Sequence, residues 1–347
     1  MRLKDIYYIL KPLIPRRLQL ALRRIRISCK RSSYSDVWPI YEKAGRIPDG
    51  FRGWPDGKKV ALILTHDVET EKGLEKCRPL AELEAGLDFK SSFFFVPERY
   101  RSSDQLRRDL AEKGFEIGVH GLNHDGKLYR SREEFRRRAE RINTYIESWG
   151  SQGFASPGMH HNLEWIHDLN IEYDISSYDT DPFEPQGGGI GAIYPFCVQD
   201  PSNNKYYIEL PYTLPQDFTL FVLMRQKNID TWKSKVDWIF EKGGMIHLKT
   251  HPDYMNFGES RMALEEYPID YYTKILEYIK DSYGGQYWHV LPRDLACFWS
   301  SHGSSDNERR NLPVTSEIFC SVCRDAAKKG CFSFFPLIKK ERPGGDK

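Results

Sequence analysis

The first group of residues that could do chemistry is a pair of carboxylates, Asp67 and Glu69. They follow a short apolar run, residues 59–64, which is typical of a buried parallel strand. Because side chains alternate along a strand, both carboxylates are expected on one face, with His66 on the other. Two carboxylates this close repel each other unless a cation or a proton lies between them. A pair of helix-capping or salt-bridged acids is the structural alternative.

The second group is a pair of histidines, His120 and His124, at the end of another apolar run, residues 115–119. Gly121 and Asn123 between them favour a loop, unlike the helical histidine pair of zinc proteases. Neutral imidazoles bind transition metals well. Together with Glu69 they give the three protein ligands that a catalytic zinc usually has. The alternative is a chance pair of histidines.

The third group lies in residues 245–254, where alternation places His247, Lys249 and His251 on one face. An inward-pointing lysine is costly unless it pairs with a carboxylate, and Asp67 and Glu69 are the candidates. The alternative is a strand at the edge of the sheet with these groups in water. As a set, the three groups suit the hydrolysis of an amide or ester. A metal activates water, a spare carboxylate takes its proton and a histidine protonates the leaving group.

The elements that must position these residues alternate between strands and helices, which predicts a mainly parallel sheet. Seven or eight such units indicate a distorted (β/α) barrel, and an open doubly wound sheet is the alternative. Strands are expected at residues 59–64, 91–96, 115–119, 153–155, 173–175, 206–210, 218–223, 245–248 and 288–291, and helices at 74–87, 104–113, 131–149, 231–242 and 267–283.

Composition divides the chain into three expected regions. Residues 1–50 form a basic, amphipathic segment, residues 51–300 the barrel domain, and residues 301–347 a flexible polar tail. A hydrophobic fraction of 40% predicts a globular core, and a net charge of +2 argues against a nucleic-acid binder. There is no apolar run of membrane-spanning length and no signal peptide, and the seven cysteines are scattered. We therefore expect a cytoplasmic protein, with peripheral membrane contact through the basic N-terminus as a further option.

The three motifs together resemble those of the polysaccharide deacetylase family, also called the NodB-homology or carbohydrate esterase 4 family, over roughly residues 58–300. The resemblance implies that Asp67 is the base and that Glu69, His120 and His124 bind a divalent metal, with zinc expected. It also implies that His251, favoured over His247, is the general acid. The substrate implied is an N-acetylated sugar or a polysaccharide precursor.

Further segments are expected to meet the substrate. Residues 154–159 are similar to the family's Arg-x-Pro motif, so Pro157 and Gly158 are expected there, with backbone N–H groups for the oxyanion. Asp179, in the acidic loop 179–189, and His247 complete the expected substrate contacts, although a plain surface loop is the alternative. Residues 211–217 are expected to form another wall. The C-terminal Cys320, Cys323 and Cys331 lack a fourth ligand for a zinc knuckle.

Two departures from the family pattern affect the prediction. Glu69 stands where the resemblance expects an aspartate, and Ala155 stands where it expects the arginine that orients the base. Our hypothesis is that Lys249 supplies part of that missing charge. Two other functions stay open: a catalytically impaired homologue that only binds glycans, and an amidohydrolase acting on a carbon–nitrogen bond outside sugars.

Overall fold

A curled sheet of nine strands forms the centre of the molecule. The computed structural model describes residues 14–101, 103–186, 189–200, 202–258 and 261–302. The strands of the sheet are β1 (Val60–Val68), β2 (Ser92–Phe95), β3 (Glu116–His120), β4 (Gly153–Ala155), β5 (Tyr173–Asp174), β6 (Phe196–Gln199), β7 (Tyr206–Glu209), β8 (Met245–Thr250) and β11 (Tyr287–His289). Their order is β11-β1-β2-β3-β4-β5-β7-β6, with β8 paired to β1. Only the β6–β7 pair is antiparallel among these pairings.

Strand β1 is the longest of the sheet and all nine of its residues are buried. Residues 61–66 pair with β8 along one edge. The other edge is shared by β11, at the start of β1, and by β2, at its end. The carboxyl end of β1 therefore lies between β2 and β8, which brings the first and third sequence motifs onto neighbouring strands.

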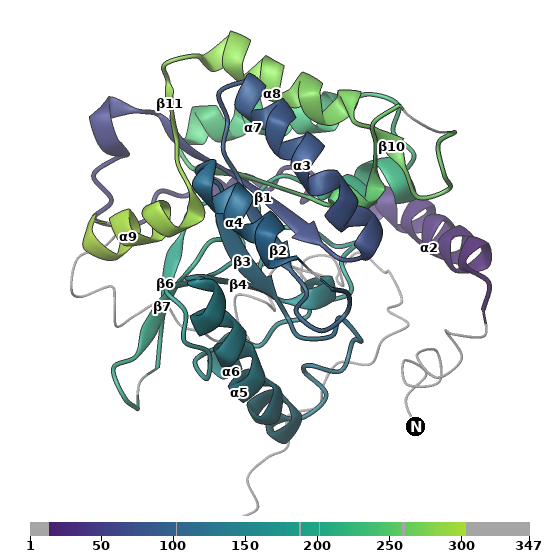
Figure 1. The fold of residues 1–347 in the computed structure, drawn as a ribbon. Helices are drawn as coiled ribbons and strands as arrows, with labels where there is room; N and C mark the ends of the chain where they lie inside the picture. Colours follow the sequence, from purple (N-terminus) through teal and green to yellow (C-terminus); the bar gives the residue numbers. More distant parts are fainter. Residues whose placement is uncertain (1–13, 102, 187–188, 201, 259–260, 303–347) are drawn as a thin grey trace, which may run out of the picture.

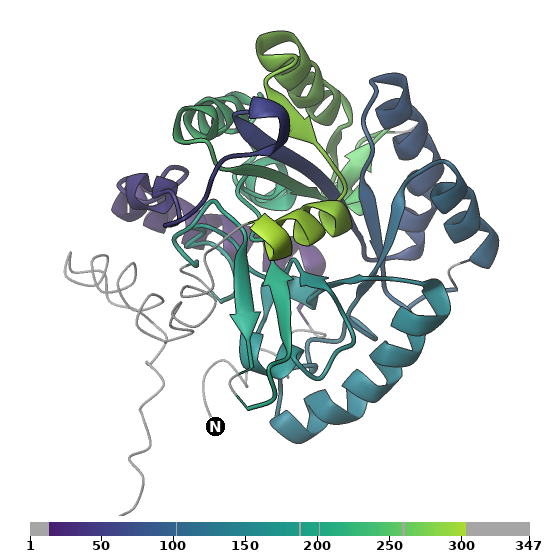
Figure 2. The same ribbon diagram turned by 90° about the vertical axis from the view of Figure 1, so that its left-hand side faces the viewer.

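Hydrogen bonds across the gap between β7 and β8 bring the sheet close to a barrel. The backbone N–H groups of Thr213 and Leu214 donate to the carbonyl oxygen of His247, at 3.2 and 3.3 Å. The Thr213 hydroxyl donates to the carbonyl oxygen of Met245 at 2.9 Å. Figure 2 shows the strands curling within a ring of helices. The predicted distorted (β/α) barrel is confirmed.

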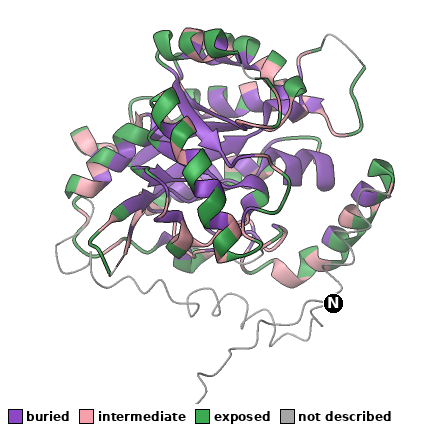
Figure 3. Ribbon diagram, turned by 60° about the horizontal axis from the view of Figure 1, so that its bottom comes forward, coloured by how far each residue is buried: buried purple, intermediate pink, exposed green. Residues whose placement is uncertain are grey.

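Helices cover the outside of the curled sheet, and Figure 3 shows the strands buried beneath them. Helix α5 illustrates how the sequence sets their ends. The Ser131 hydroxyl accepts a hydrogen bond from the backbone N–H of Glu134, and Gly150 ends the helix in a left-handed conformation, at φ 61°. The covering helices are α3 (Glu71–Gly86), α4 (Asp104–Glu112), α5 (Arg132–Trp149), α6 (Leu163–Ile166), α7 (Asp230–Lys242), α8 (Asp270–Tyr283) and α9 (Pro292–His302).

One predicted strand is wrong. Residues 218–223 form a buried π-helix, η6 (Phe218–Leu223), rather than a strand. The Asp217 carboxylate caps it by accepting from the Phe218 N–H at 2.8 Å. All six residues are buried, and a fully apolar run carries no period that separates a strand from a helix. Strand β6, which pairs antiparallel with β7, was not predicted either.

The N-terminal helix α2 (Arg16–Arg31) packs on η6. Leu20 and Ile27 of α2 form a small apolar cluster with Phe218, Val222 and Leu223. Within the described residues, no helix combines the length and the apolar character needed to cross a membrane. The predicted tail and the C-terminal cysteines lie outside the described residues, apart from the tail's first two residues, which end α9. The predicted region boundaries stay predictions.

Candidate metal centre

The inner faces of β1 and β8 bring the first and third motifs into contact, as their alternation predicts. Thr65 Oγ1 lies 2.8 Å from His247 Nε2, and Asp67 Oδ2 lies 3.2 Å from Lys249 Nζ. His66 points to the opposite side, where it meets Thr250. The carboxylate and the ammonium are both buried, so each charge is compensated by the other rather than by water.

The second motif joins this site from β3 and the loop after it. Gly121 has φ 62°, and a Cβ there would lie 2.3 Å from the Pro157 ring, so only glycine allows this close approach. His124 also has a positive φ, 53°, which is unusual for a residue with a side chain and marks a constrained loop. The turn places the two imidazoles side by side, with ring centroids 5.2 Å apart.

Hydrogen bonding prepares His120 for a metal. Its Nδ1 lies 3.0 Å from the carbonyl oxygen of Ala155, which can only accept, so Nδ1 carries the proton and Nε2 keeps its lone pair. Burial lowers the pKa of His120 to about 4, so the ring is neutral at neutral pH. Among the described residues, its Nε2 is a buried atom without a hydrogen-bond partner, as is Asp67 Oδ1.

Glu69, His120 and His124 form the one group of potential metal ligands found in the described residues. One ligand atom from each lies within 4.8 Å of the others. His124 Nε2 lies 3.0 Å from Glu69 Oε1. Two imidazoles and a carboxylate are the donor set of a catalytic zinc site. The unpartnered Nε2 of His120 fits such an ion. The residues present therefore fit the predicted metal.

Glu69 is held in place by the segment that follows β8. Its backbone N–H donates to the Asp253 carboxylate at 2.9 Å, and Tyr254 donates its hydroxyl to Glu69 Oε2, also at 2.9 Å. Helix α3 approaches so closely that a Cβ on Gly73 would lie 2.2 Å from Asp253 Oδ2. Burial alone would raise the pKa of Glu69, but the neighbouring His124 and other histidines hold it well below its usual range.

Asp67 and Lys249 form a buried ion pair on the inner face of the sheet. Besides Asp67, the Lys249 ammonium donates to the carbonyl oxygen of Ile175 at 3.0 Å. Burial would raise the pKa of Asp67, but its electrostatic interactions with His120 and Lys249 outweigh that effect, and the pKa lies below its usual value. Ala155 is fully buried and paired in register with His120. A cation therefore accompanies the predicted base although the arginine is absent.

His251 is paired with Asp217, which stabilises the protonated form of its ring. Its Nδ1 lies 2.7 Å from Asp217 Oδ1, and its backbone N–H donates to Oδ2 of the same carboxylate. Burial would lower the pKa of His251, but the Asp217 carboxylate outweighs it and raises the pKa to about 10. The ring is protonated at neutral pH, and its Nε2 can give a proton to a leaving group.

His247 differs from His251, because both of its ring nitrogens are used. Its Nδ1 faces the carbonyl oxygen of Leu210 at 3.2 Å and must donate, so Nε2 accepts from the Thr65 hydroxyl. Burial lowers its pKa to about 3. A neutral, fully bonded imidazole is a poor general acid, which supports the preference for His251.

Of the other residues expected to contact the substrate, two lie in a turn beside the histidine loop and the third is buried in an ion pair. Pro157 and Gly158 lie in the short turn η5 (Pro157–Met159) beside the histidine loop. Asp179 is fully buried, and its carboxylate lies 2.6 Å from the ammonium of Lys235 on α7. Burial raises the pKa of Asp179 to about 6, against the effect of Lys235. Contact of these residues with a substrate stays a prediction.

Sequence reasoning missed the supporting carboxylates of the site. Asp217 lay in a segment expected to form a wall, and Asp253 lay in the third motif without a role. A second inward pair, Asp174 on β5 and Glu209 on β7, is fully buried. Burial and their mutual repulsion raise the pKa of Glu209 well above its usual range. Asp253 directly follows His251 and Pro252, and this closeness to the third motif was the only sequence feature that could have suggested a role for it.

The family comparison agrees with this geometry. The polysaccharide deacetylase family model matches residues 56–162, which include Asp67, Glu69, His120 and His124. The resemblance predicted from the motifs is confirmed over these residues. No curated protein matches the sequence significantly.

Solved structures with similar folds cover most of the chain. The "putative polysaccharide deacetylase" of Mycobacterium smegmatis is 18% identical, with a TM-score of 0.56 over 74% of this chain and 96% of its own. The Puue allantoinase is 17% identical, with a TM-score of 0.56 over 73% of this chain and 94% of its own. At such low identity these likenesses show the fold.

Proposed function

We propose that the chain is a metal-dependent hydrolase that removes N-acetyl groups from a carbohydrate, either a cell-surface polysaccharide or its precursor. The observation that carries the proposal is the convergence of unpartnered atoms. His120 Nε2 and Asp67 Oδ1 are buried without hydrogen-bond partners, beside His124 and Glu69. Buried polar atoms without partners are rare unless a ligand or ion satisfies them.

The metal expected is zinc, held by Glu69, His120 and His124. When bound, it would supply Lewis-acid activation of water and of the acetyl carbonyl. The residues of the chain do the rest. Asp67 takes the proton of the attacking water, and Lys249 at 3.2 Å keeps its carboxylate ionised and oriented.

His251 then acts on the leaving amine. Because Asp217 holds its Nδ1 proton, the Nε2 proton is the one that transfers to the departing nitrogen. Backbone N–H groups in the turn after β4, near Met159, would stabilise the oxyanion. Asp67 and His251 thus divide the roles of base and acid between two motifs on neighbouring strands.

Two measurements on the purified protein test this proposal together. Elemental analysis should find about one equivalent of zinc. An assay of acetate release on a panel of N-acetylated sugars should detect turnover that chelation removes and Zn²⁺ restores. Asp67→Asn is the control, because it leaves the three ligands intact and should reduce turnover by about a hundredfold to ten-thousandfold.

The outcomes separate the remaining functions. Stoichiometric metal with no acetate release from any sugar would favour a glycan-binding homologue. Turnover on cyclic or linear amides alone would assign the same site to a different amidohydrolase. A cytoplasmic location stays a prediction, which cell fractionation tests.

A further inference from the structure

Helix α2 carries apolar side chains on two opposite faces. Leu20 and Ile27 are buried against η6. Leu18, Leu22 and Ile25 are exposed, at 51%, 50% and 60%. Spacings of four and three residues place these three on one stripe, about half a turn from the buried pair. A helix needs only one apolar face to pack on a domain, so the outer stripe is not needed for packing α2 on the described part of the chain.

The charge of α2 is of one sign. Its sixteen residues include no acidic side chain and seven basic ones: Arg16, Arg17, Arg23, Arg24, Arg26, Lys30 and Arg31. An apolar stripe bordered by cations is the pattern of helices that lie in the interface of an anionic membrane. The apolar side chains enter the acyl region while long cationic side chains reach the phosphates.

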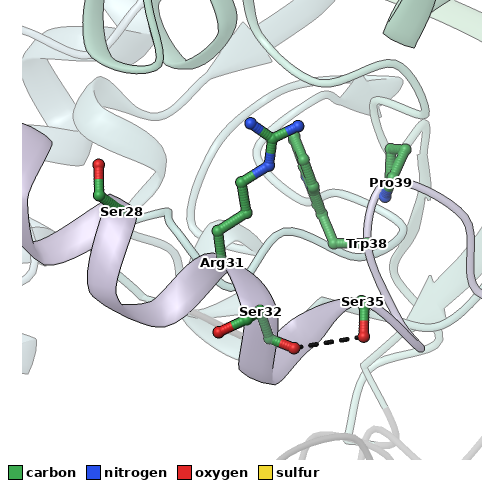
Figure 4. A pocket seen from close by; sticks show the side chains of 6 residues that line it. All are labelled: Ser28, Arg31, Ser32, Ser35, Trp38 and Pro39. Atoms are coloured by element: carbon green, nitrogen blue, oxygen red, sulfur yellow. Dashed lines mark hydrogen bonds between the residues drawn. The ribbon is translucent and has the colours of Figure 1, made fainter.

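Two pockets lie beside α2, lined partly by its own side chains. The smaller, of about 30 Å³, lies between α2 and the loop after β5, and is lined by Arg23, Arg26, Ile27, Lys30, Pro182 and Phe183. The larger, of about 490 Å³, is lined by Ser28, Arg31, Ser32, Ser35, Trp38 and Pro39. Figure 4 shows the Arg31 guanidinium beside the Trp38 ring, with serine hydroxyls at the rim. Cations line both pockets and serine hydroxyls line the larger one, which suits phosphate headgroups.

The helix is fixed to the barrel, so a membrane that bound it would orient the whole molecule. The Arg24 guanidinium donates two hydrogen bonds, of 3.0 and 2.9 Å, to the carbonyl oxygen of Val222 in η6. The Arg23 guanidinium lies 4.9 Å from the centre of the Phe218 ring. The segment η6 follows directly on Asp217, the partner of His251. Helix α2 therefore lies on the same side of the molecule as the candidate site (Figure 1).

We propose that the outer face of α2 docks on an anionic lipid bilayer. Leu18, Leu22 and Ile25 enter the acyl boundary, and the flanking cations contact lipid phosphates. The charge of the helix selects a bilayer over an apolar protein surface, because exposed cations, among them Arg17 and Arg31, lie on the same helix as the apolar stripe. Docking is independent of the proposed chemistry, and it would hold the candidate site beside substrates carried on lipids.

Sedimentation of the full chain with vesicles tests the proposal. We expect binding to vesicles that contain phosphatidylglycerol, weakened by salt, and little binding to pure phosphatidylcholine. The triple variant Leu18→Gln/Leu22→Gln/Ile25→Gln should bind anionic vesicles at least about tenfold more weakly. Removing one cation, as in Arg17→Gln, should cost about fivefold.

Matched controls separate docking from folding. The variant Ile47→Gln/Tyr206→Gln replaces two other exposed apolar side chains, at 56% and 48%, and should bind as the wild type does. Both variants should keep the wild-type circular dichroism spectrum. The proposal is overturned if the wild type does not bind, if it binds neutral vesicles equally, or if the triple variant keeps full binding. Loss of a dimer in the triple variant, seen by light scattering, would assign the stripe to a second copy instead.

Discussion

Strands β1 and β8 carry polar side chains on both the outer and the inner face of the sheet. The two faces differ in how fully these side chains are hydrogen-bonded. On the outer side, His66 lies between Thr250 and Glu84, with 2.8 Å to each through its two ring nitrogens. Glu84 also accepts from the hydroxyls of Ser91 and Tyr272. This network is buried and closed, since each ring nitrogen of His66 and each carboxylate oxygen of Glu84 has a partner.

The inner side is equally buried and equally polar, but it is open. Asp67 pairs with Lys249 through one oxygen and leaves the other without a partner, as His120 leaves its Nε2. Because His66 and Asp67 are buried neighbours on one strand, burial and polarity cannot distinguish the scaffold from the site. The unused hydrogen-bonding capacity on the inner side distinguishes the site from the scaffold, because a metal or a substrate could satisfy it.

The largest effect expected on the inner side is that of Lys249→Met. Losing the cation leaves the Asp67 carboxylate buried and unpaired, so turnover per folded molecule should fall by at least about a thousandfold. Zinc content should not change, since the three ligands are untouched. Acetate release and elemental analysis on the same sample measure both.

Lys235→Met is the matched control, because it breaks another buried ion pair, with Asp179 at 2.6 Å. Each variant should lose roughly 3–5 kcal/mol of stability. When rates are corrected for the folded fraction, the Lys249 variant should lose much more turnover than the Lys235 variant, whose partner Asp179 is expected only to contact the substrate. Full turnover in folded Lys249→Met would show that the lysine does not replace the arginine.

The closed outer network should affect stability rather than chemistry. Glu84→Gln places an amide among donors from His66, Ser91 and Tyr272, and should cost about 3 kcal/mol of unfolding free energy. Burial would raise the pKa of Glu84, but His66 outweighs it and the pKa lies below its usual value. Its stabilisation is therefore present at neutral pH and is lost as the pH falls through the lowered pKa. Denaturation by urea at neutral and acidic pH measures this loss.

A control for the same comparison is turnover by folded Glu84→Gln. The rate should stay within about tenfold of the wild type, because the carboxylate contacts no residue of the inner side. A collapse of turnover with little loss of stability would mean that the two sides are not separable.

The inner side could be predicted well from the sequence because its residues are close to strands. Alternation on β1 and β8 predicted a carboxylate partner for Lys249, with Asp67 and Glu69 as the candidates, and the structure pairs it with Asp67. The histidine loop was likewise marked by Gly121. Local patterns of this kind survive folding because the strand geometry alone fixes which side a residue faces.

The supporting residues could not be predicted in this way. Asp217 reaches His251 from 34 positions earlier in the chain, and nothing in its neighbours announces that contact. The buried run 218–223 gave the wrong element, because a helix and a strand bury such a run equally well. Lys235 was assigned only to a helix, and its pairing with Asp179 depends on how α7 packs.

Asp217→Asn sharpens the comparison by its effect on pH dependence. His251 must be protonated to act as an acid, so activity is present below its pKa of about 10 and is lost as the pH rises through it. Without the Asp217 charge, burial lowers the pKa and the alkaline limb should move to lower pH. Tyr254 packs against the ring, and the charges of Asp67 and Glu69 still raise the pKa. A pH–rate profile with an unmoved alkaline limb would exclude His251 as the acid.

The smallest effect is expected from Ala155→Arg in the otherwise unchanged chain. The side chain at 155 shares the side of His120, but the place beside Asp67 is already filled by the Lys249 ammonium. An added arginine therefore has no unpaired carboxylate to meet, and turnover should stay equal or fall. In the Lys249→Met background the same substitution should restore part of the lost turnover, because the carboxylate is then free. A large gain in acetate release from Ala155→Arg alone would instead mean that the natural chain is an impaired copy. Lys249 would then not replace the missing arginine.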